Sequence, residues 1–141
     1  QIIYQYPKVT AFGTLFSQLG ALDLQYKLAY NHKFIMSYVN DVKQDEYLKN
    51  NSEQGVVIIY SNSGNYLNKY QLSSFDEKKK YDYKNKKVIL ITANEMMVNH
   101  PDVDICLVYQ HLSKLQTHSY IYPLINDLIV AEYRSFQNAN F

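Results

Sequence analysis

The chain has 141 residues, 47% of them hydrophobic, and its 14 basic and 13 acidic residues leave a net charge of +1. A chain of this size and composition can bury the core of one domain without a structural metal or a disulfide framework. Its one arginine is Arg134, whereas DNA-reading surfaces usually carry several arginines in a basic stripe, so we expect no nucleic-acid binding by this chain alone.

Targeting and redox features point to the cytoplasm. The single cysteine, Cys106, lies in an apolar run and excludes a disulfide within one chain. No apolar run reaches about 18 residues and no signal-peptide pattern is present, so we expect no membrane partner. The four histidines stand at no metal-ligand spacing, and we expect neither a metal site nor a cofactor. The chain begins at Gln1, which suggests a fragment or a processed chain whose residues 1–7 lead in from a missing domain.

Short β-rich segments recur along the chain. They predict strands at residues 9–12, 33–36, 56–60, 88–92 and 104–108. The segments at 56–60 and 88–91 are apolar throughout, which is typical of strands covered on both faces, as in a parallel sheet.

Segments with helical spacing fill the intervals between these strands. The second predicted helix is capped by Asp41 and runs through Leu48, a third covers 65–72, and a short helix precedes the fifth strand. The first predicted helix has one apolar face, formed by Leu15, Leu19, Leu22 and Tyr26. The last helix has Pro123 in or near its first turn and an apolar stripe formed by Ile121, Leu124, Ile125, Leu128 and Ile129.

The alternation of strand and helix predicts one α/β domain over residues 1–141. We expect a doubly wound, mostly parallel five-stranded sheet with helices on both faces, of flavodoxin-like type. In such sheets the ligand binds at the carboxyl ends of the strands, near the point where the strand order reverses. The residues that directly follow each strand are therefore the candidates for a site.

The loop Ser61-Asn62-Ser63-Gly64 follows the third strand and opens a predicted helix. Serine hydroxyls donate hydrogen bonds to phosphate oxygens, and Gly64 allows close backbone approach. The amides of a following helix attract anions. The alternative is an ordinary serine-rich turn with a helix cap.

Two companion loops strengthen the anion-site interpretation. Gly13, Thr14 and Ser17 follow the first strand, and Thr92 ends the fourth. Because the carboxyl ends of parallel strands meet at one edge of the sheet, we expect these hydroxyl-bearing loops to form a joint small-molecule site.

The order of these motifs resembles the SIS, or sugar isomerase, domain over residues 9–133, and specifically the version in MurR/RpiR-family bacterial transcriptional regulators. Residues 61–66 resemble the family's S-x-S-G-x-T phosphate loop. Residues 12–28 resemble its G-x-G-x-S start followed by D-x-x-x-K-L, and residues 87–92 its K-V-I-x-I-T strand. Residues 119–128 resemble its closing helix.

The resemblance implies a domain that binds a sugar phosphate and forms a homodimer or a higher homo-oligomer. In the regulators, an N-terminal helix-turn-helix domain, absent from this chain, binds DNA, and the SIS domain senses the phosphosugar. The implied ligand-binding residues are Gly13, Thr14, Ser17, Ser61, Asn62, Ser63, Gly64, Tyr66 and Thr92.

The chain departs from the family pattern in several places: Lys43 stands nearest to a histidine that the family often has after the second strand, and the serine often found after the threonine of the fourth strand is absent from residues 94–99. Leu15 stands where the family has the second glycine of its first loop, and Tyr66 stands where it has a threonine. No catalytic residue is assigned. One alternative is an aldose–ketose isomerase, for which Glu95 is the best-placed base, and another is a degenerate SIS domain that serves only in dimerisation.

Overall fold

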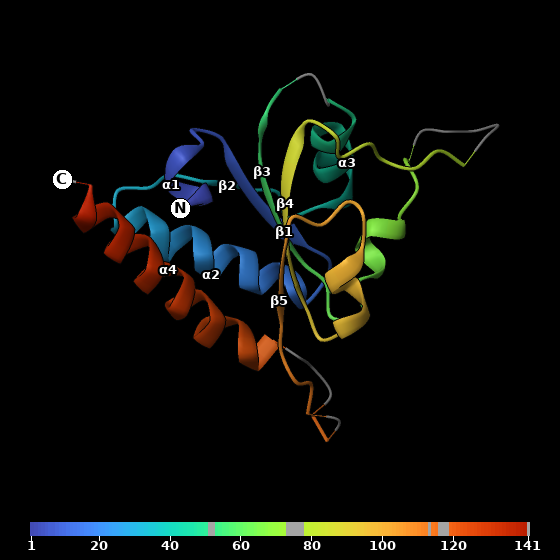
Figure 1. The fold of residues 1–141 in the computed structure, drawn as a ribbon. Helices are drawn as coiled ribbons and strands as arrows, with labels where there is room; N and C mark the ends of the chain where they lie inside the picture. The colour runs from blue at the N-terminus through green and yellow to red at the C-terminus, as the bar shows by residue number, and fades with distance from the viewer. Residues whose placement is uncertain (51–52, 73–77, 113, 116–118, 141) are drawn as a thin grey trace.

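A computed structural model describes residues 1–50, 53–72, 78–112, 114–115 and 119–140, and its centre is a parallel sheet (Figure 1). The five strands run in the order β2-β1-β3-β4-β5, and each neighbouring pair is parallel. Four of the five predicted strands are confirmed nearly in full, whereas the second, expected at 33–36, is found at Met36–Ser37 and shares only Met36 with the prediction. The strands are β1 (Val9–Gly13), β2 (Met36–Ser37), β3 (Gly55–Tyr60), β4 (Lys86–Thr92) and β5 (Ile105–Val108).

Helices cover both faces of this sheet. The α-helices are α1 (Ile2–Gln5), α2 (Ser17–Tyr30), α3 (Asp41–Lys49) and α4 (Tyr122–Ala139), and the 3-10 helices are η1 (Asn65–Asn68), η2 (Glu95–Asn99) and η3 (Ser119–Ile121). Figure 1 shows α2 and α4 side by side on one face and α3 on the other. The predicted doubly wound α/β fold is therefore confirmed. In the described part of the chain, no helix is long and apolar enough to cross a membrane.

The central strand β3 shows why the sheet needs two helical layers. Every residue of β3 is buried. Val56, Ile58 and Tyr60 belong to the core beneath α2 and α4, whereas Val57 and Ile59 belong to the core on the α3 side. Alternate residues of a strand point to opposite faces, so this continuously apolar segment supplies both cores.

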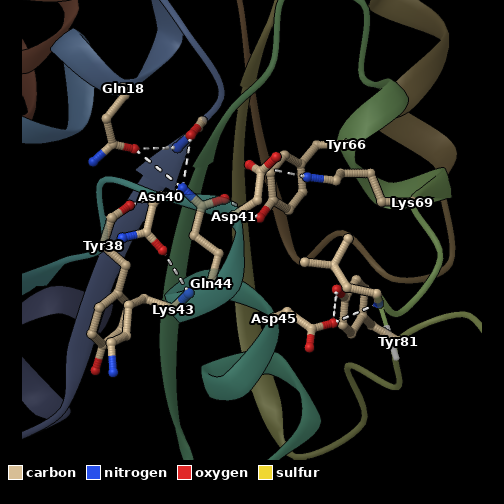
Figure 2. Close-up of polar contacts among 12 residues, drawn as sticks. Gln18, Tyr38, Asn40, Asp41, Lys43, Gln44, Asp45, Tyr66, Lys69 and Tyr81 are labelled. Carbon is tan, nitrogen blue, oxygen red and sulfur yellow. Dashed lines mark hydrogen bonds and ion pairs between the residues drawn. The ribbon is translucent and has the colours of Figure 1, made fainter. Parts of the chain in front are cut away.

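Three details of the predicted helices are wrong. The helix expected over 65–72 is only the 3-10 helix η1, and Lys69 beyond it is already extended. Asparagine and tyrosine, which make up half of this segment, favour helix weakly. The cap of α3 is Asn40, whose side chain accepts a hydrogen bond from the Lys43 amide (Figure 2), and Asp41 is the first helical residue. Residues 2–5, expected as part of a lead-in segment, form α1, and its Ile3 packs in the core.

The apolar face of α2 also differs from the prediction. Leu15, Leu19 and Tyr26 are exposed, and the buried residues are Ser17, Gln18, Gly20, Ala21, Leu24 and Leu28. Gln18 is buried because its side chain hydrogen-bonds Gly13 at the end of β1 and Ser37 at the end of β2, and Ser17 is buried against the Tyr122 hydroxyl of α4. Apolar periodicity cannot detect such contacts. In α4, Pro123 lies in the first turn as predicted, but Leu124 and Leu128 are exposed.

The register brings three loops to one edge of the sheet. Gly13 at the end of β1 pairs with Tyr60 at the end of β3, and Tyr60 pairs with Ile91, the next-to-last residue of β4. The chain leaves β1 toward β2 and returns to β3 on the other side. The loops after β1 and β3 therefore flank the point where the strand order reverses.

Candidate functional site

A pocket of about 300 Å³ opens at this reversal point. Its size is at the lower end of the range of about 300–1,000 Å³ that is usual for small-molecule sites. It lies between the β1–α2 loop and the β3–η1 loop. Its lining contains no charged side chain and consists of Thr14, Leu15, Phe16, Ser17, Ser61, Asn62 and Ser63.

The β3–η1 loop is a tight turn that its own serines stabilise. The Gly64 amide donates to the Ser61 carbonyl at 3.1 Å, and Gly64 has a φ of 81°. The Tyr66 amide donates to Ser61 Oγ at 3.3 Å and the Asn65 amide to Ser63 Oγ at 3.2 Å. A hydroxyl that accepts a hydrogen bond keeps its own proton, so both serines can still donate to a bound anion. Because η1 has only four residues, donors from side chains matter more here than a helix dipole.

The β1–α2 loop approaches β3 unusually closely. A Cβ atom on Gly13 would lie 2.6 Å from the Tyr60 carbonyl oxygen and 2.8 Å from Ser17 Cβ. Leu15, which replaces a glycine of the family pattern, has a φ of 51°. The loop thus keeps the left-handed conformation that favours glycine, and the Leu15 side chain remains 88% exposed.

Thr92 does not line the pocket, but it hydrogen-bonds the backbone of the serine loop that does. Its side chain is fully buried. The Thr92 hydroxyl donates to the Asn62 carbonyl at 3.0 Å and accepts from the Asn94 amide at 3.1 Å. Asn94 Nδ2 in turn donates to the Ser63 carbonyl at 3.0 Å. The end of β4 therefore fixes the backbone of the serine loop.

The Tyr66 side chain does not line the pocket and packs in the core on the α3 side, and Figure 2 shows it beside Asp41 and Lys69. Its hydroxyl donates to Gln44 Oε1 at 2.5 Å, and burial raises its pKa far above the ordinary value, so it stays protonated. Gln44 Nε2 donates to the carbonyl oxygens of Gly13, at 2.9 Å, and Tyr38, at 2.8 Å. The Gly13 amide donates to Gln18 Oε1 at 3.0 Å. This buried network holds the end of β1 in place.

Two tyrosines that the sequence did not single out connect the two sides of the pocket. The Tyr109 hydroxyl donates to Asn62 Oδ1 at 2.6 Å and lies 3.3 Å from the Tyr122 hydroxyl, which lies 3.2 Å from Ser17 Oγ. Burial raises the pKa of both tyrosines, so both hydroxyls are neutral donors. The position of Tyr109, directly after the fifth strand, is the signal that could have found it.

The structure thus brings together the predicted residues Thr14, Ser17, Ser61, Asn62 and Ser63 as the lining. Gly13 and Gly64 shape the two loops. The side chains of Tyr66 and Thr92 lie outside the lining. Glu95, the isomerase candidate, is an exposed first residue of η2 and does not line the pocket either. Among the described residues, no three His, Cys, Asp or Glu side chains gather as a metal site requires.

Comparison with known proteins finds solved structures with a similar fold. No family model and no curated protein matches the sequence. A solved structure from Bacteroides fragilis, described as a candidate phosphosugar isomerase involved in capsule formation, superposes with a TM-score of 0.66 at 19% identity, over 96% of this chain and 72% of that chain. A solved hypothetical protein superposes with a TM-score of 0.63 at 13% identity, over 97% of this chain and 74% of that chain. The chain therefore shares their parallel α/β fold.

Proposed function

We propose that this chain binds a sugar phosphate in the pocket between the β1–α2 and β3–η1 loops. The observation that carries the proposal is the convergence of the Ser17, Ser61 and Ser63 hydroxyls, with the Asn62 amide, at the reversal point of the sheet. These groups are neutral donors, which suit a phosphate that is anchored by directed hydrogen bonds. The fold shared with a candidate phosphosugar isomerase is in keeping with this ligand class.

We propose further that the domain senses the ligand, as the effector domain of an RpiR-type transcriptional regulator. Isomerisation needs a carboxylate or histidine over the sugar carbons, and the described lining contains neither. With one arginine and a net charge of +1, DNA contact falls to a preceding helix-turn-helix domain. An isomerase is the second candidate, and the description of the Bacteroides protein is in keeping with it.

Calorimetric titration with ribose 5-phosphate, glucose 6-phosphate and fructose 6-phosphate tests the binding proposal. We expect at least one to bind, and Ser63→Ala to weaken that binding by about ten- to a hundredfold, because one hydrogen bond to an anion is lost. Ser135→Ala, at an exposed position of α4, is the matched control and should change nothing. Binding of none of the sugars would favour a degenerate domain that serves only in dimerisation. Turnover of a bound sugar that Glu95→Gln abolishes would favour the isomerase.

We also propose that the domain forms a homodimer through α4. Leu124 and Leu128 are 58% and 63% exposed. Beside them, a largely apolar groove of about 460 Å³ lies between α4 and the β5 edge, with Ile105, Leu107 and Ile129 in its lining. A stable dimer interface buries about 800 Å² on each partner, and an apolar helix face beside an apolar groove could supply its centre.

Leu128→Glu is therefore expected to convert the dimer to a monomer, because the interface would bury an unpaired carboxylate. Sedimentation velocity measures the change in mass. Val42→Glu places the same charge at an exposed position of α3, on the opposite face of the sheet, and should leave the dimer intact. A dimer that tolerates Leu128→Glu would mean that another surface is used.

A further inference from the structure

The Asn62 side-chain amide is a donor of the pocket lining whose direction depends on a neighbouring residue. A primary amide has an acceptor end and a donor end of similar size, and either end could face the pocket. Asn62 follows the first serine of the loop, and its backbone carbonyl is held by Thr92 Oγ1 and by the Ala93 amide. The backbone is thus fixed, and only the rotation of the side-chain amide decides which end meets a ligand.

Tyr109 fixes the orientation of this amide. Its hydroxyl lies 2.6 Å from Asn62 Oδ1 and donates to it. The Nδ2 end, on the other side of the same amide group, makes no hydrogen bond to the described residues and is not among their buried polar atoms without a partner. Since Asn62 lines the pocket, the acceptor end is occupied by Tyr109 and the donor end remains for a ligand.

The ring of Tyr109 is itself held firmly. It packs edge-on against Tyr122, with ring centroids 5.8 Å apart at an interplanar angle of 90°, and Tyr122 packs edge-on against Tyr60 at 5.0 Å. Tyr109 is 8% exposed and Tyr122 is fully buried. A hydroxyl on a ring that is packed in this way has little freedom, so it can impose an orientation on a side chain at the surface of the pocket.

We propose that Tyr109 is a positioning residue that turns the Asn62 amide so that its NH₂ group donates to a phosphate oxygen of the bound sugar phosphate. This inference rests on the proposed function and adds a donor and its orienting group to it. Without the Tyr109 hydroxyl, the Asn62 amide is free to rotate and to turn its Oδ1 atom toward the phosphate. The partial negative charge on Oδ1 would then repel the anion. Affinity would then fall although every residue of the lining is still present.

A double-mutant cycle tests this proposal with inorganic phosphate and ribose 5-phosphate as the probes. We expect Asn62→Ala and Tyr109→Phe each to weaken binding by about tenfold, the loss of one hydrogen bond to an anion. In the Asn62→Ala background, Tyr109→Phe should have no further effect, because its hydroxyl acts only through Asn62. Equal losses from Tyr109→Phe in both backgrounds would overturn the proposal, since a general loss of packing is additive.

A second measurement needs no bound sugar and separates this inference from the proposed function. In the ligand-free protein, NMR should show cross-relaxation from the Asn62 Nδ2 protons to the Ser17 or Ser63 β-protons, and only weakly to the Tyr109 ring. Tyr109→Phe should reduce this preference. Stronger cross-relaxation to the Tyr109 ring in the native protein would overturn the inference. If neither probe binds but the amide is oriented as expected, the proposed ligand fails and the positioning role stands.

Discussion

Asn126→Leu is expected to lower the free energy of unfolding by about 2–4 kcal/mol, although leucine has the same branched arrangement of side-chain heavy atoms as asparagine. Asn126 is fully buried in α4. Its Oδ1 accepts from the Tyr60 hydroxyl at 2.5 Å, and its Nδ2 donates to the Gly20 carbonyl at 2.8 Å and to Asp23 Oδ2 at 2.9 Å. Leucine can replace none of these bonds, so the Tyr60 hydroxyl would be left buried and unsatisfied.

Urea denaturation measures this loss, and the midpoint should fall while the slope stays constant. The matched control is the double variant Tyr60→Phe with Asn126→Leu, in which both partners of the buried bond are apolar. Removing both partners is often nearly neutral, so the double variant should be more stable than Asn126→Leu alone. If the double variant instead loses the sum of what Tyr60→Phe and Asn126→Leu each lose relative to the native protein, the two side chains are energetically independent.

The Asn126 hydrogen bonds are linked to the pocket through the chain, because they join α4 to Tyr60, which directly precedes the serine loop, and to α2, which begins at Ser17. The ring of Tyr60 packs against Tyr122, and a Cβ atom on Gly20 would lie 2.7 Å from Tyr60 and 2.8 Å from Tyr122. The absence of a side chain at residue 20 lets both rings reach α2. The position of the Tyr122 hydroxyl beside Ser17 thus depends on a polar contact in the core.

The five strands, their parallel arrangement and the edge that carries the site could be predicted because they follow from local patterns. Continuous apolar segments indicate a strand covered on both faces, and alternating helices impose a parallel sheet. Once the sheet is parallel, the loops that contain Ser17, Ser61 and Ser63 must meet at one edge. The resemblance to the SIS domain then supplied a ligand class for that edge.

The roles of individual side chains could not be predicted, because they depend on contacts between distant parts of the chain. Tyr109 is 47 residues from Asn62, and Tyr122 is 105 residues from Ser17. Tyr66 looked like a replaced ligand residue, yet its ring fills the core beside Phe12 and its hydroxyl satisfies Gln44. Spacing along the sequence indicates which loop a residue belongs to, but not which side of the loop its side chain occupies.

Two left-handed residues flank the pocket, and opposite substitutions at them should have opposite effects on stability. Gly64→Ala is expected to lower the free energy of unfolding by about 2–4 kcal/mol. Part of this is the cost of about 1–2 kcal/mol for a Cβ atom in the left-handed region. The rest comes from overpacking, because the new Cβ would lie 2.6 Å from Met97 Cγ.

Leu15→Gly is the matched counterpart, since Leu15 already has a φ of 51° and its exposed side chain makes little packing contribution. Relief of the backbone strain offsets the greater chain entropy of glycine in the unfolded state, so the free energy of unfolding should rise by between zero and about 1 kcal/mol.

Urea denaturation of Gly64→Ala with and without Met97→Ala separates the backbone strain at Gly64 from the overpacking against Met97. We expect about half of the loss to persist when Met97 is truncated, because the backbone strain remains. A loss that vanishes entirely in that background would mean that the left-handed turn is not required by the serine loop.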